Sequence, residues 1–515
     1  MPDLDLLVLG SGVAGLSAAV RAAELHGMRV GVLTKAELHQ ATTRWAQGGV
    51  AAVLGGDPDS TDLHLADTLA AGAGLCDVDA VRVLVDEGPG RVHELIALGA
   101  AFDRDVDGQL QLAREGGHSL PRIVHAGGAA TGEEIERTLV EAVSESVKVV
   151  HESTFALDLL VEDGRCRGVL AAMPGGEQRE VRAANVLLAT GGYGQLFAVT
   201  TNPSEATGDG VAMALRAGVA VADVEFQQFH PTALHHPAMP RPLLSEALRG
   251  HGALLRDAKG ERFVEELLSR DKVSRAIATR MLEQDVDHLW LDATGLDQFA
   301  ERFPTIMAAL SAVGLDPATD WLPIAPAAHY SCGGVVADLD GASSLAGLWV
   351  AGETSCNGVM GANRLASNSL LDGMVFGPRV VEAIDRGVVG PSATGAMRSV
   401  LGGGEIPGRS LMVPPVGDRL IADRDALQRA MTLNAGVLRS AESLATAAAV
   451  CDGSVEGGDP AAWELRNLAT VGRALCTAAL AREESRGAHT RSDFESLRSD
   501  LRVRFVIDGS VASEA

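Results

Sequence analysis

Short apolar runs, each ending in a glycine turn, mark the start of the chain. Residues 4–10 (LDLLVLG) form a continuous apolar run that predicts a buried strand, and residues 14–27 (AGLSAAVRAAELHG) have the spacing of a helix. A second apolar run at residues 29–35 (RVGVLTK) predicts another strand. A strand, a helix and a strand in this order indicate the beginning of a parallel sheet, and therefore an α/β fold.

The same strand-and-glycine pattern returns twice, far along the chain. Residues 185–192 (NVLLATGG) and 347–354 (GLWVAGET) both contain an apolar run followed by glycine. We therefore expect one discontinuous nucleotide-binding domain, residues 1–223 and 331–400, interrupted by an inserted domain at residues 224–330. Beyond the glycine-rich stretch 401–408 the sequence shifts to helical runs, which predicts a C-terminal helical domain at residues 401–515.

The composition argues against several classes of partner. The net charge of −25 disfavours nucleic acids and anionic membranes. No apolar run approaches the roughly 18 residues of a membrane helix, and the N-terminus lacks the basic region of a signal peptide. Six scattered cysteines contain no CxxC pair, so neither a disulfide framework nor a metal site is expected. We predict a cytoplasmic protein that captures any anionic substrate in a local cationic pocket.

A glycine fingerprint follows the first predicted strand. GSGVAG supplies Gly10 for the tight turn, Gly12 for approach of the backbone to a pyrophosphate, and Gly15 for close packing of helix and strand. The alternative interpretation is a turn with a purely structural role. The second strand ends in Thr34 and Lys35 instead of the acid that usually grips a ribose hydroxyl, so a generic NAD site fits poorly.

Six motifs occur in the order in which one flavoprotein family carries them. They are TTRWAQGGVAA (residues 42–52), NPSEATGDGVAMALRAG (202–218), FQQFHPTAL (226–234), SEALRGHGALL (245–255), APAAHYSCGGV (325–335) and GANRLASNSLLDGMVFG (361–377). Over residues 4–380 the chain resembles the flavoprotein family of succinate dehydrogenase, fumarate reductase and L-aspartate oxidase. The resemblance implies a Rossmann-like FAD-binding domain, an inserted α+β capping domain and a C-terminal helical domain.

The resemblance also implies which residues bind FAD. They are Gly10, Ser11, Gly12, Val13, Ala14, Gly15, Lys35, Thr42, Thr43, Ala46, Gln47, Gly48, Gly49, Asp209, Glu353, Ser369 and Leu370. Glu353, at a strand end, can accept hydrogen bonds from hydroxyl groups of the cofactor; a solvated loop acid is the alternative interpretation. A helix beginning near Ser369 would point its positive end at the flavin ring, which favours the anionic reduced flavin.

Two positions distinguish members of this family. The membrane-complex members attach FAD through a histidine at the position of Thr42, so we expect FAD to be bound noncovalently here. Glu115 precedes two glycines where succinate and fumarate enzymes have an aromatic residue. A carboxylate at about 4 Å would repel a dicarboxylate by on the order of 4 kcal/mol, but it would attract an α-ammonium group. Glu115 therefore indicates an aspartate substrate, unless it is an ordinary loop acid.

The remaining site residues are inferred from the motifs. The expected substrate-binding residues, besides Glu115, are His230, Ser245, Glu246, His329 and Arg364. Arg364 and His329 are expected to clamp one carboxylate while His230 and Ser245 hold the other, and Arg364, His329, His230 and Glu115 are also counted as catalytic. By resemblance, Arg275 in RDKVSRAIATRM takes the central catalytic position as proton donor or acceptor. A guanidinium has a pKa above about 12 and therefore keeps its proton at neutral pH. Stabilising charge and orienting the substrate is thus an alternative role for Arg275.

The expected reaction is oxidation of L-aspartate to iminoaspartate by hydride transfer to flavin N5. Dioxygen, giving hydrogen peroxide, or fumarate, giving succinate, would reoxidise the flavin. In the family this reaction begins de novo NAD synthesis, which makes quinolinate synthase a candidate partner. The rival hypotheses are a soluble fumarate reductase or succinate dehydrogenase flavoprotein, and an FAD-binding protein without catalytic activity.

Overall fold

The computed structural model describes residues 4–508, and a mixed sheet forms its centre. Strand β1 (Leu4–Leu9) lies between β2 (Val30–Leu33) and β9 (Gln178–Leu188), and all three are parallel. Strand β16 (Leu348–Val350) pairs in parallel with β9, and β6 (Val149–His151) extends the sheet beyond β2. The strand-and-glycine segments far apart in the sequence therefore end at the same edge of one sheet, as their pattern predicts.

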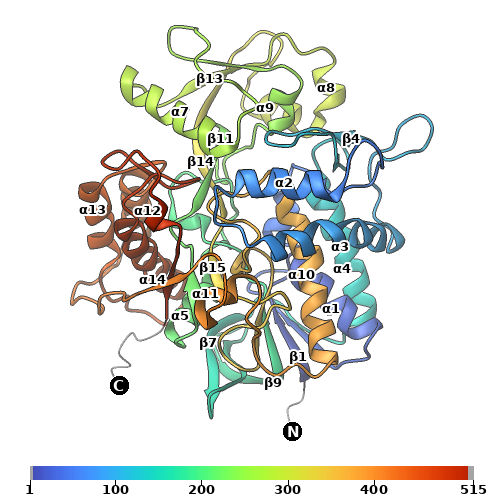
Figure 1. Ribbon diagram of the computed structural model, residues 1–515, viewed down its shortest axis with the longest axis vertical. Coiled ribbons are helices and arrows are strands. Elements are labelled where there is room, and N and C mark those ends of the chain that lie inside the picture. The colour runs from blue at the N-terminus through green and yellow to red at the C-terminus, as the bar shows by residue number, and fades with distance from the viewer. Residues whose placement is uncertain (1–3, 509–515) are drawn as a thin grey trace.

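Helices α1 (Val13–Glu24) and α10 (Asn368–Asp385), which pack beside this sheet, approach each other closely because glycines of α10 face α1. Helix α1 packs between α10 and α4 (Thr131–Ser146), and α10 also contacts α3 (Val78–Ala97) (Figure 1). A Cβ atom on Gly377 of α10 would overlap the carbonyl oxygen of Ala14 in α1. The close packing of α1 and α10 brings the beginnings of both helices to the carboxyl ends of the parallel strands.

An antiparallel sheet with short helices forms a second layer, which we name the capping region (residues 227–331). Its sheet has the order β11 (Gln227–Leu234), β14 (Leu322–Ser331), β13 (Leu289–Asp292) and β12 (Leu254–Arg256). The helices are α6 (Glu246–Gly250), α7 (Arg270–Gln284), α8 (Phe299–Arg302) and α9 (Pro304–Ala312). Apolar side chains such as Leu255, Ile277 and Leu291 form its own core, and Figure 1 shows it as the yellow-green top of the molecule. The expected α+β insertion is present.

Within residues 401–508 the C-terminal part contains the expected helices and also four short strands that were not predicted. Helices α12 (Arg424–Asn434), α13 (Ala441–Cys451) and α14 (Pro460–Ala481) lie together on the left of Figure 1. Strands β18 (Gly408–Leu411) and β21 (Arg504–Ile507) pair with each other, and β21 also pairs with β10 (Val221–Ala222). Strands β15 (Gly334–Val336) and β17 (Ser355–Cys356) complete this five-stranded sheet. The C-terminal segment is thus tied into the first domain.

Smaller elements complete the chain. They are η1 (Thr42–Trp45), β3 (Val50–Ala51), α2 (Thr61–Ala71), β4 (Leu112–Ala113), β5 (Ile123–Val124), the antiparallel pair β7 (Phe155–Glu162) and β8 (Arg165–Ala172), η2 (Gly194–Leu196), α5 (Asp209–Arg216), η3 (Gly352–Thr354), η4 (Gly395–Met397), α11 (Arg398–Leu401), β19 (Leu438–Arg439), β20 (Thr490–Arg491) and η5 (Ser499–Leu501).

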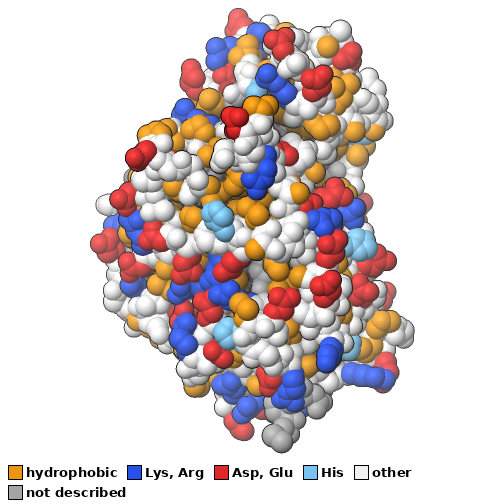
Figure 2. Space-filling view, turned by 90° about the vertical axis from the view of Figure 1, so that its right-hand side faces the viewer, with side chains coloured by type: hydrophobic (Ala, Val, Ile, Leu, Met, Phe, Trp, Pro, Cys, Tyr) orange, Lys and Arg blue, Asp and Glu red, His pale blue; other side chains and the backbone are white. Residues whose placement is uncertain are grey.

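The surface carries charges of both signs. On the face shown in Figure 2, acidic and basic side chains are interspersed. Each helix within residues 4–508 is too short or too polar to cross a lipid bilayer.

Candidate active site

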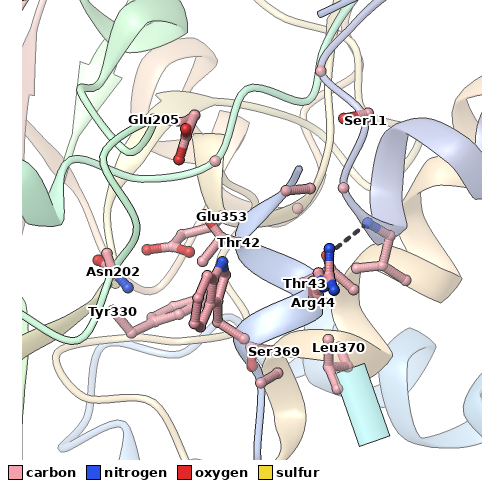
Figure 3. A pocket seen from close by; sticks show the side chains of 18 of the residues that line it. Ser11, Thr42, Thr43, Arg44, Asn202, Glu205, Tyr330, Glu353, Ser369 and Leu370 are labelled. Atoms are coloured by element: carbon pink, nitrogen blue, oxygen red, sulfur yellow. Dashed lines mark hydrogen bonds between the residues drawn. The ribbon is translucent and has the colours of Figure 1, made fainter. Parts of the chain in front are cut away.

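A cavity of about 740 Å³ lies between the parallel sheet and the capping region. Its walls come from the glycine turn after β1, from η1, from the loops after β9 and β16, and from the start of α10. Figure 3 shows the labelled side chains of Thr42, Tyr330, Glu353 and Ser369 arranged around this space. The volume falls within the range of about 300–1,000 Å³ that is typical of sites for small molecules and cofactors.

The glycine turn brings main-chain atoms to the cavity wall. Gly10 has φ +107°, and a Cβ atom there would overlap the carbonyl oxygen of Ala189 at the end of β9. A Cβ atom on Gly15 would overlap the carbonyl oxygen of Gly10, so Gly15 permits close packing of α1 while standing behind the wall. The start of α1 faces the cavity at Val13, whose N–H donates to the Thr43 hydroxyl over 2.9 Å. The Thr43 hydroxyl therefore satisfies one N–H at the start of α1, and N–H groups that stay free at a helix N-terminus are those that bind diphosphates.

Lys35 sits in an acidic cluster at one end of the cavity. Its Nζ atom lies 2.9 Å from Asp209 at the start of α5 and 2.8 Å from Glu464 of α14. Burial disfavours the charged amine, but the carboxylates of Asp209 and Glu464 outweigh burial and raise the pKa of Lys35. The C-terminal segment therefore helps to build this end of the cavity.

The polar groups of the wall fit FAD. The Gln47 Oε1 atom is buried without a hydrogen-bond partner among the described residues, as expected of a group that meets a ligand. Burial raises the pKa of Glu353 to about 7, although its carboxylate accepts a 2.9 Å hydrogen bond from the Ser331 N–H. The hydroxyl groups of a cofactor would supply the hydrogen bonds that these acceptors lack.

Comparison with known proteins agrees with this geometry. The profile of the FAD binding domain family matches residues 5–370, and that of the fumarate reductase flavoprotein C-terminal family matches residues 460–506. The L-aspartate oxidase of Streptomyces coelicolor is 49% identical over 523 residues, which cover 95% of this chain and 88% of that protein. The L-aspartate oxidase of Mycobacterium tuberculosis is 43% identical, covering 98% and 95%.

The chain belongs to the L-aspartate oxidase family.

A solved structure of Escherichia coli quinol fumarate reductase shares the fold, with a TM-score of 0.85 and 30% identity over 97% of this chain and 92% of that chain. The L-aspartate oxidase family therefore lies within the larger group of succinate dehydrogenase and fumarate reductase flavoproteins, and FAD is its cofactor.

The structure places almost all of the expected cofactor residues at the cavity. The residues that line it are Gly10, Ser11, Gly12, Val13, Ala14, Lys35, Thr42, Thr43, Ala46, Gln47, Gly48, Gly49, Asp209, Glu353, Ser369 and Leu370. Gly15 is the exception, because it stands behind Gly10 as described above. Thr42 lies in η1 at the cavity wall and offers a hydroxyl where a covalent attachment needs a ring nitrogen.

Cationic and imidazole groups gather at the end of the cavity beneath the capping region. Arg364, His329 and Arg270 all line it there. The Arg364 guanidinium donates to the Ser369 hydroxyl (2.6 Å) and to Gln228 Oε1 (3.0 Å from NH2), and it stacks 4.4 Å from the Tyr330 ring centre. Burial and then the charge of Arg270 lower the pKa of Arg364 to about 10, so it remains cationic at neutral pH. This local pocket opposes the negative charge of the whole chain.

Two neutral histidines lie beside these arginines. Burial, followed by the charge of Arg270, lowers the pKa of both His230 and His329 well below its usual range. His329 Nδ1 is hydrogen-bonded to the Thr201 hydroxyl at 2.7 Å, and its ring meets the His230 ring edge to face at 5.1 Å. His230 Nδ1 accepts the Thr232 N–H, so the proton of the neutral ring belongs on Nε2, which has no partner within the described structure. His230 therefore holds a free donor immediately behind His329.

Glu115 is buried directly behind the cavity wall. Only 2% of its surface is exposed, and its carboxylate accepts a 2.6 Å hydrogen bond from the Ser367 hydroxyl. A Cβ atom on Gly48 would lie 3.6 Å from Ser367 Oγ and 3.8 Å from Glu115 Oε1, and both Gly48 and Ser367 line the cavity. Burial opposes ionisation, but the hydrogen bond and charge of His125, followed by the charge of Arg270, lower the pKa of Glu115. The carboxylate is therefore ionised and is not a solvated loop acid.

The local structure explains why two glycines follow Glu115. A Cβ atom on Gly116 would overlap the carboxylate of Glu246, and Gly117 has φ +86°. The turn can therefore bring Glu115 and Glu246 close to the same arginine. Glu246 Oε2 accepts a 2.8 Å hydrogen bond from Arg270 Nε.

The expected central role of Arg275 does not agree with its position. Arg275 does not line the cavity: its Nε donates to the Thr490 hydroxyl at 3.1 Å, and its NH2 lies 3.4 Å from the Gly487 carbonyl. Arg270, five residues earlier on α7, lines the cavity instead. Five helical residues correspond to a rotation of about 140°, so the two guanidinium groups leave different faces of the helix. The sequence analysis did not single out Arg270, which lines the cavity.

The other expected substrate residues surround Arg270 without lining the cavity. The Ser245 hydroxyl caps α6 by accepting the Ala247 N–H at 3.1 Å. Glu246 Oε1 lies 3.5 Å from an NH2 group of Arg249, so the Glu246 carboxylate bridges Arg249 and Arg270. Arg241, which was also not predicted, reaches the cavity from the segment after β11. In the sequence, the position of Arg270 at the start of a helix could have indicated that it reaches the cavity. Arg241 has no comparable feature in the sequence.

Proposed function

We propose that this chain oxidises L-aspartate to iminoaspartate with FAD as the hydride acceptor. One observation carries the proposal: the ionised Glu115 carboxylate is held directly behind a cavity whose lining includes Arg270 and Arg364. Two cationic groups suit the two carboxylates of a four-carbon diacid. A buried anion beside them attracts an ammonium group, which aspartate has and succinate lacks.

The arginines and histidines would fix the two carboxylates of the substrate. Arg364 is held rigidly by Gln228, Ser369 and the Tyr330 ring, so its guanidinium presents a fixed plane for a bidentate contact. His329 lies beside it in the cavity wall. The Nε2–H of His230 has no hydrogen-bond partner within the described structure. A small shift of the His329 ring would let this N–H donate to the substrate carboxylate that Arg364 binds.

Arg270 would orient the substrate and stabilise charge at its reacting carbon. Its Nε atom is committed to Glu246, which leaves the NH groups of the guanidinium for the substrate. Glu246 also bridges to Arg249, so the three side chains form a continuous buried path from the cavity. The hydrogen bond to Glu246 and the ion pair behind it hold the Arg270 guanidinium in place at the cavity. We assign to Arg270 the role that the sequence analysis gave to Arg275.

FAD, when bound, supplies the two-electron oxidation by accepting a hydride equivalent at its flavin ring. The protein residues supply binding, orientation and charge. Gly10, Gly12 and the start of α1 would hold the diphosphate, and Glu353 would accept from hydroxyl groups of the cofactor. The start of α10 at Ser369 would face the flavin ring with the positive end of the helix dipole.

We also propose the electron acceptor, the enzyme that receives the product, and the cellular compartment. Dioxygen or fumarate would reoxidise the cofactor, and the arginines at the substrate end of the cavity favour fumarate as one acceptor. The product imine would pass to quinolinate synthase at the start of de novo NAD synthesis. All six cysteines are free and buried, which fits a reducing compartment, and we place the reaction in the cytoplasm.

Anaerobic mixing tests the proposal. Purified holoenzyme is mixed with L-aspartate, succinate or fumarate without oxygen, and the flavin absorbance near its visible maximum is followed. L-aspartate should bleach the flavin in a saturable way, and subsequent fumarate should restore the colour. Bleaching by succinate but not by L-aspartate would favour a fumarate reductase or succinate dehydrogenase flavoprotein, and no bleaching by either would indicate a non-catalytic FAD-binding protein.

A further inference from the structure

Three potential metal ligands meet on the capping region, outside the active site. They are His235, directly after β11, and the neighbouring Asp287 and His288, in the turn between α7 and β13. One ligand atom from each lies within 4.8 Å of the other two. We propose that these three side chains bind one divalent transition-metal ion of the zinc type.

The distances suit such an ion. Asp287 Oδ1 lies 2.7 Å from His288 Nδ1, and Asp287 Oδ2 lies 3.7 Å from His235 Nε2. In a tetrahedral site with bonds of about 2.0–2.1 Å, ligand atoms lie about 3.3–3.4 Å from one another. These two separations need to change by less than about 1 Å to reach this value, which small rotations of surface side chains provide, and the ligand nitrogens of the two histidines lie within 4.8 Å of each other.

The fold holds the two histidines in place before an ion binds. The His235 N–H donates to the Pro323 carbonyl of β14 at 2.8 Å, which fixes the end of β11. The His235 and His288 rings stack with centres 5.0 Å apart and planes inclined by 21°. Trp290 of β13 packs against the His288 ring at 4.7 Å. The stack keeps the two rings next to each other, and each ring needs to turn only partly out of it to direct a nitrogen at one shared ion.

The chemistry of the three ligands also suits the ion. Neutral imidazoles and one carboxylate are common ligands of zinc, and three protein ligands leave a position for water. A neutral ring and an ionised carboxylate are the forms that bind metals. The side chains of His235 and Asp287 are 37% and 78% exposed, so an ion and its water can enter from solvent.

The location gives the site a connection to the cavity. His235 begins the segment 235–243, whose far end places Arg241 in the cavity wall. The turn with Asp287 and His288 follows the end of α7, whose first residue is Arg270. A bound ion would fasten these two pieces of the capping region to each other, away from the flavin and the substrate.

Calorimetric titration of tag-free, chelator-treated holoenzyme with Zn²⁺ tests the site. We expect one ion per chain with a dissociation constant in the micromolar range. His288→Gln, His235→Gln and Asp287→Asn should each weaken binding by about tenfold or more. His236→Gln, next to His235 but outside the cluster, is the matched control and should bind Zn²⁺ as the unaltered protein does.

A second readout uses Trp290. Cu²⁺ should quench part of the tryptophan fluorescence, and Trp290→Phe should remove that part while leaving the calorimetric binding of Zn²⁺ in place. Flavin absorbance and circular dichroism establish that each variant is folded. The proposal is overturned if Zn²⁺ does not bind saturably at 200 µM or below, or if the three cluster variants bind it as tightly as His236→Gln.

Discussion

The carboxylate of Glu115 accepts a 2.6 Å hydrogen bond from the Ser367 hydroxyl, although the two residues are 252 positions apart in the sequence. Ser367 has φ +62° and stands immediately before α10, so this contact links the Glu115 turn to the start of the helix that faces the flavin site. His125 lies 3.4 Å from the other oxygen of Glu115. The charge of Glu115 is thus held at a fixed place behind Gly48 and Ser367, which makes its contribution to substrate choice measurable.

Glu115→Gln should reduce kcat/KM for L-aspartate by about 100-fold while fumarate reduction changes by less than about threefold. The glutamine keeps the shape of the side chain but removes the charge that attracts the ammonium group, an interaction on the order of a few kcal/mol. Steady-state kinetics with both substrates measure the effect. Glu205→Gln, which removes another carboxylate from the cavity wall, is the control for a general loss of negative charge. Equal losses with L-aspartate and fumarate would contradict a selective role of Glu115.

Arg270→Lys should lower kcat for L-aspartate by about 10³-fold, whereas Arg275→Lys should lower it by less than about tenfold. Lysine keeps the positive charge near Glu246 but cannot hold both Glu246 and the substrate with a planar guanidinium. Arg275 contacts Thr490 and Gly487 outside the cavity, so its replacement changes how α7 is fastened without touching the substrate. Rapid anaerobic reduction of the flavin by L-aspartate measures both rates. The reverse order of the two losses would return the central role to Arg275.

Acid precipitation of the holoenzyme should release all of the FAD into the supernatant. Thr42 lies at the cavity wall with a hydroxyl side chain and cannot form the attachment that a histidine forms at this position. Added FAD should also stabilise the protein, by about 2.7 kcal/mol at a free concentration of 100 times its dissociation constant. Flavin absorbance of the pellet and the supernatant decides the first point, and melting curves with increasing FAD decide the second. Yellow colour that stays with the precipitated protein would contradict noncovalent binding.

Much of the cofactor site could be predicted from the sequence because its motifs are local. The glycine turn needs Gly10 and Gly15 at fixed spacing, since backbone atoms of Ala189 and Gly10 occupy the space where side chains would stand. Helix α1 and strand β1 adjoin the turn directly, so the apolar pattern predicts their positions as well.

The substrate end was harder to predict because its residues meet through tertiary packing. Arg270 and Arg275 share one helix and similar surroundings in the sequence, and only the direction from which the capping region approaches decides which of them reaches the cavity. Arg241 lies in an irregular segment, where no periodicity indicates direction. Strand β21 was missed for a related reason: its four residues are too short a run to be distinguished from the helices before it.

Glu136 should make the protein less stable as the pH rises from 5 to 8. This residue of α4 is 2% exposed, and neither carboxylate oxygen has a partner within the described part of the chain. Burial raises its pKa to about 8, and the charge of Arg44 offsets burial only in part. The pKa of an unfolded glutamate is about 4.3, so between these values the folded protein keeps a proton that the unfolded chain releases. Stability contributed by the protonated form is therefore complete at low pH and is lost as the pH approaches 8, by about 3 kcal/mol between pH 5 and 8.

Glu136→Gln removes this titration, so the free energy of unfolding of the variant should decline by about 3 kcal/mol less than that of the unaltered protein over the same pH range. Urea unfolding at pH 5, 6, 7 and 8 with saturating FAD measures the difference. Glu145→Gln, at an exposed position of the same helix, is the matched control and should leave the pH profile unchanged. Parallel pH profiles for the Glu136 variant and the unaltered protein would mean that Glu136 is ionised in the folded state. Its carboxylate would then need a cationic partner, or water that reaches the interface between α4 and η1.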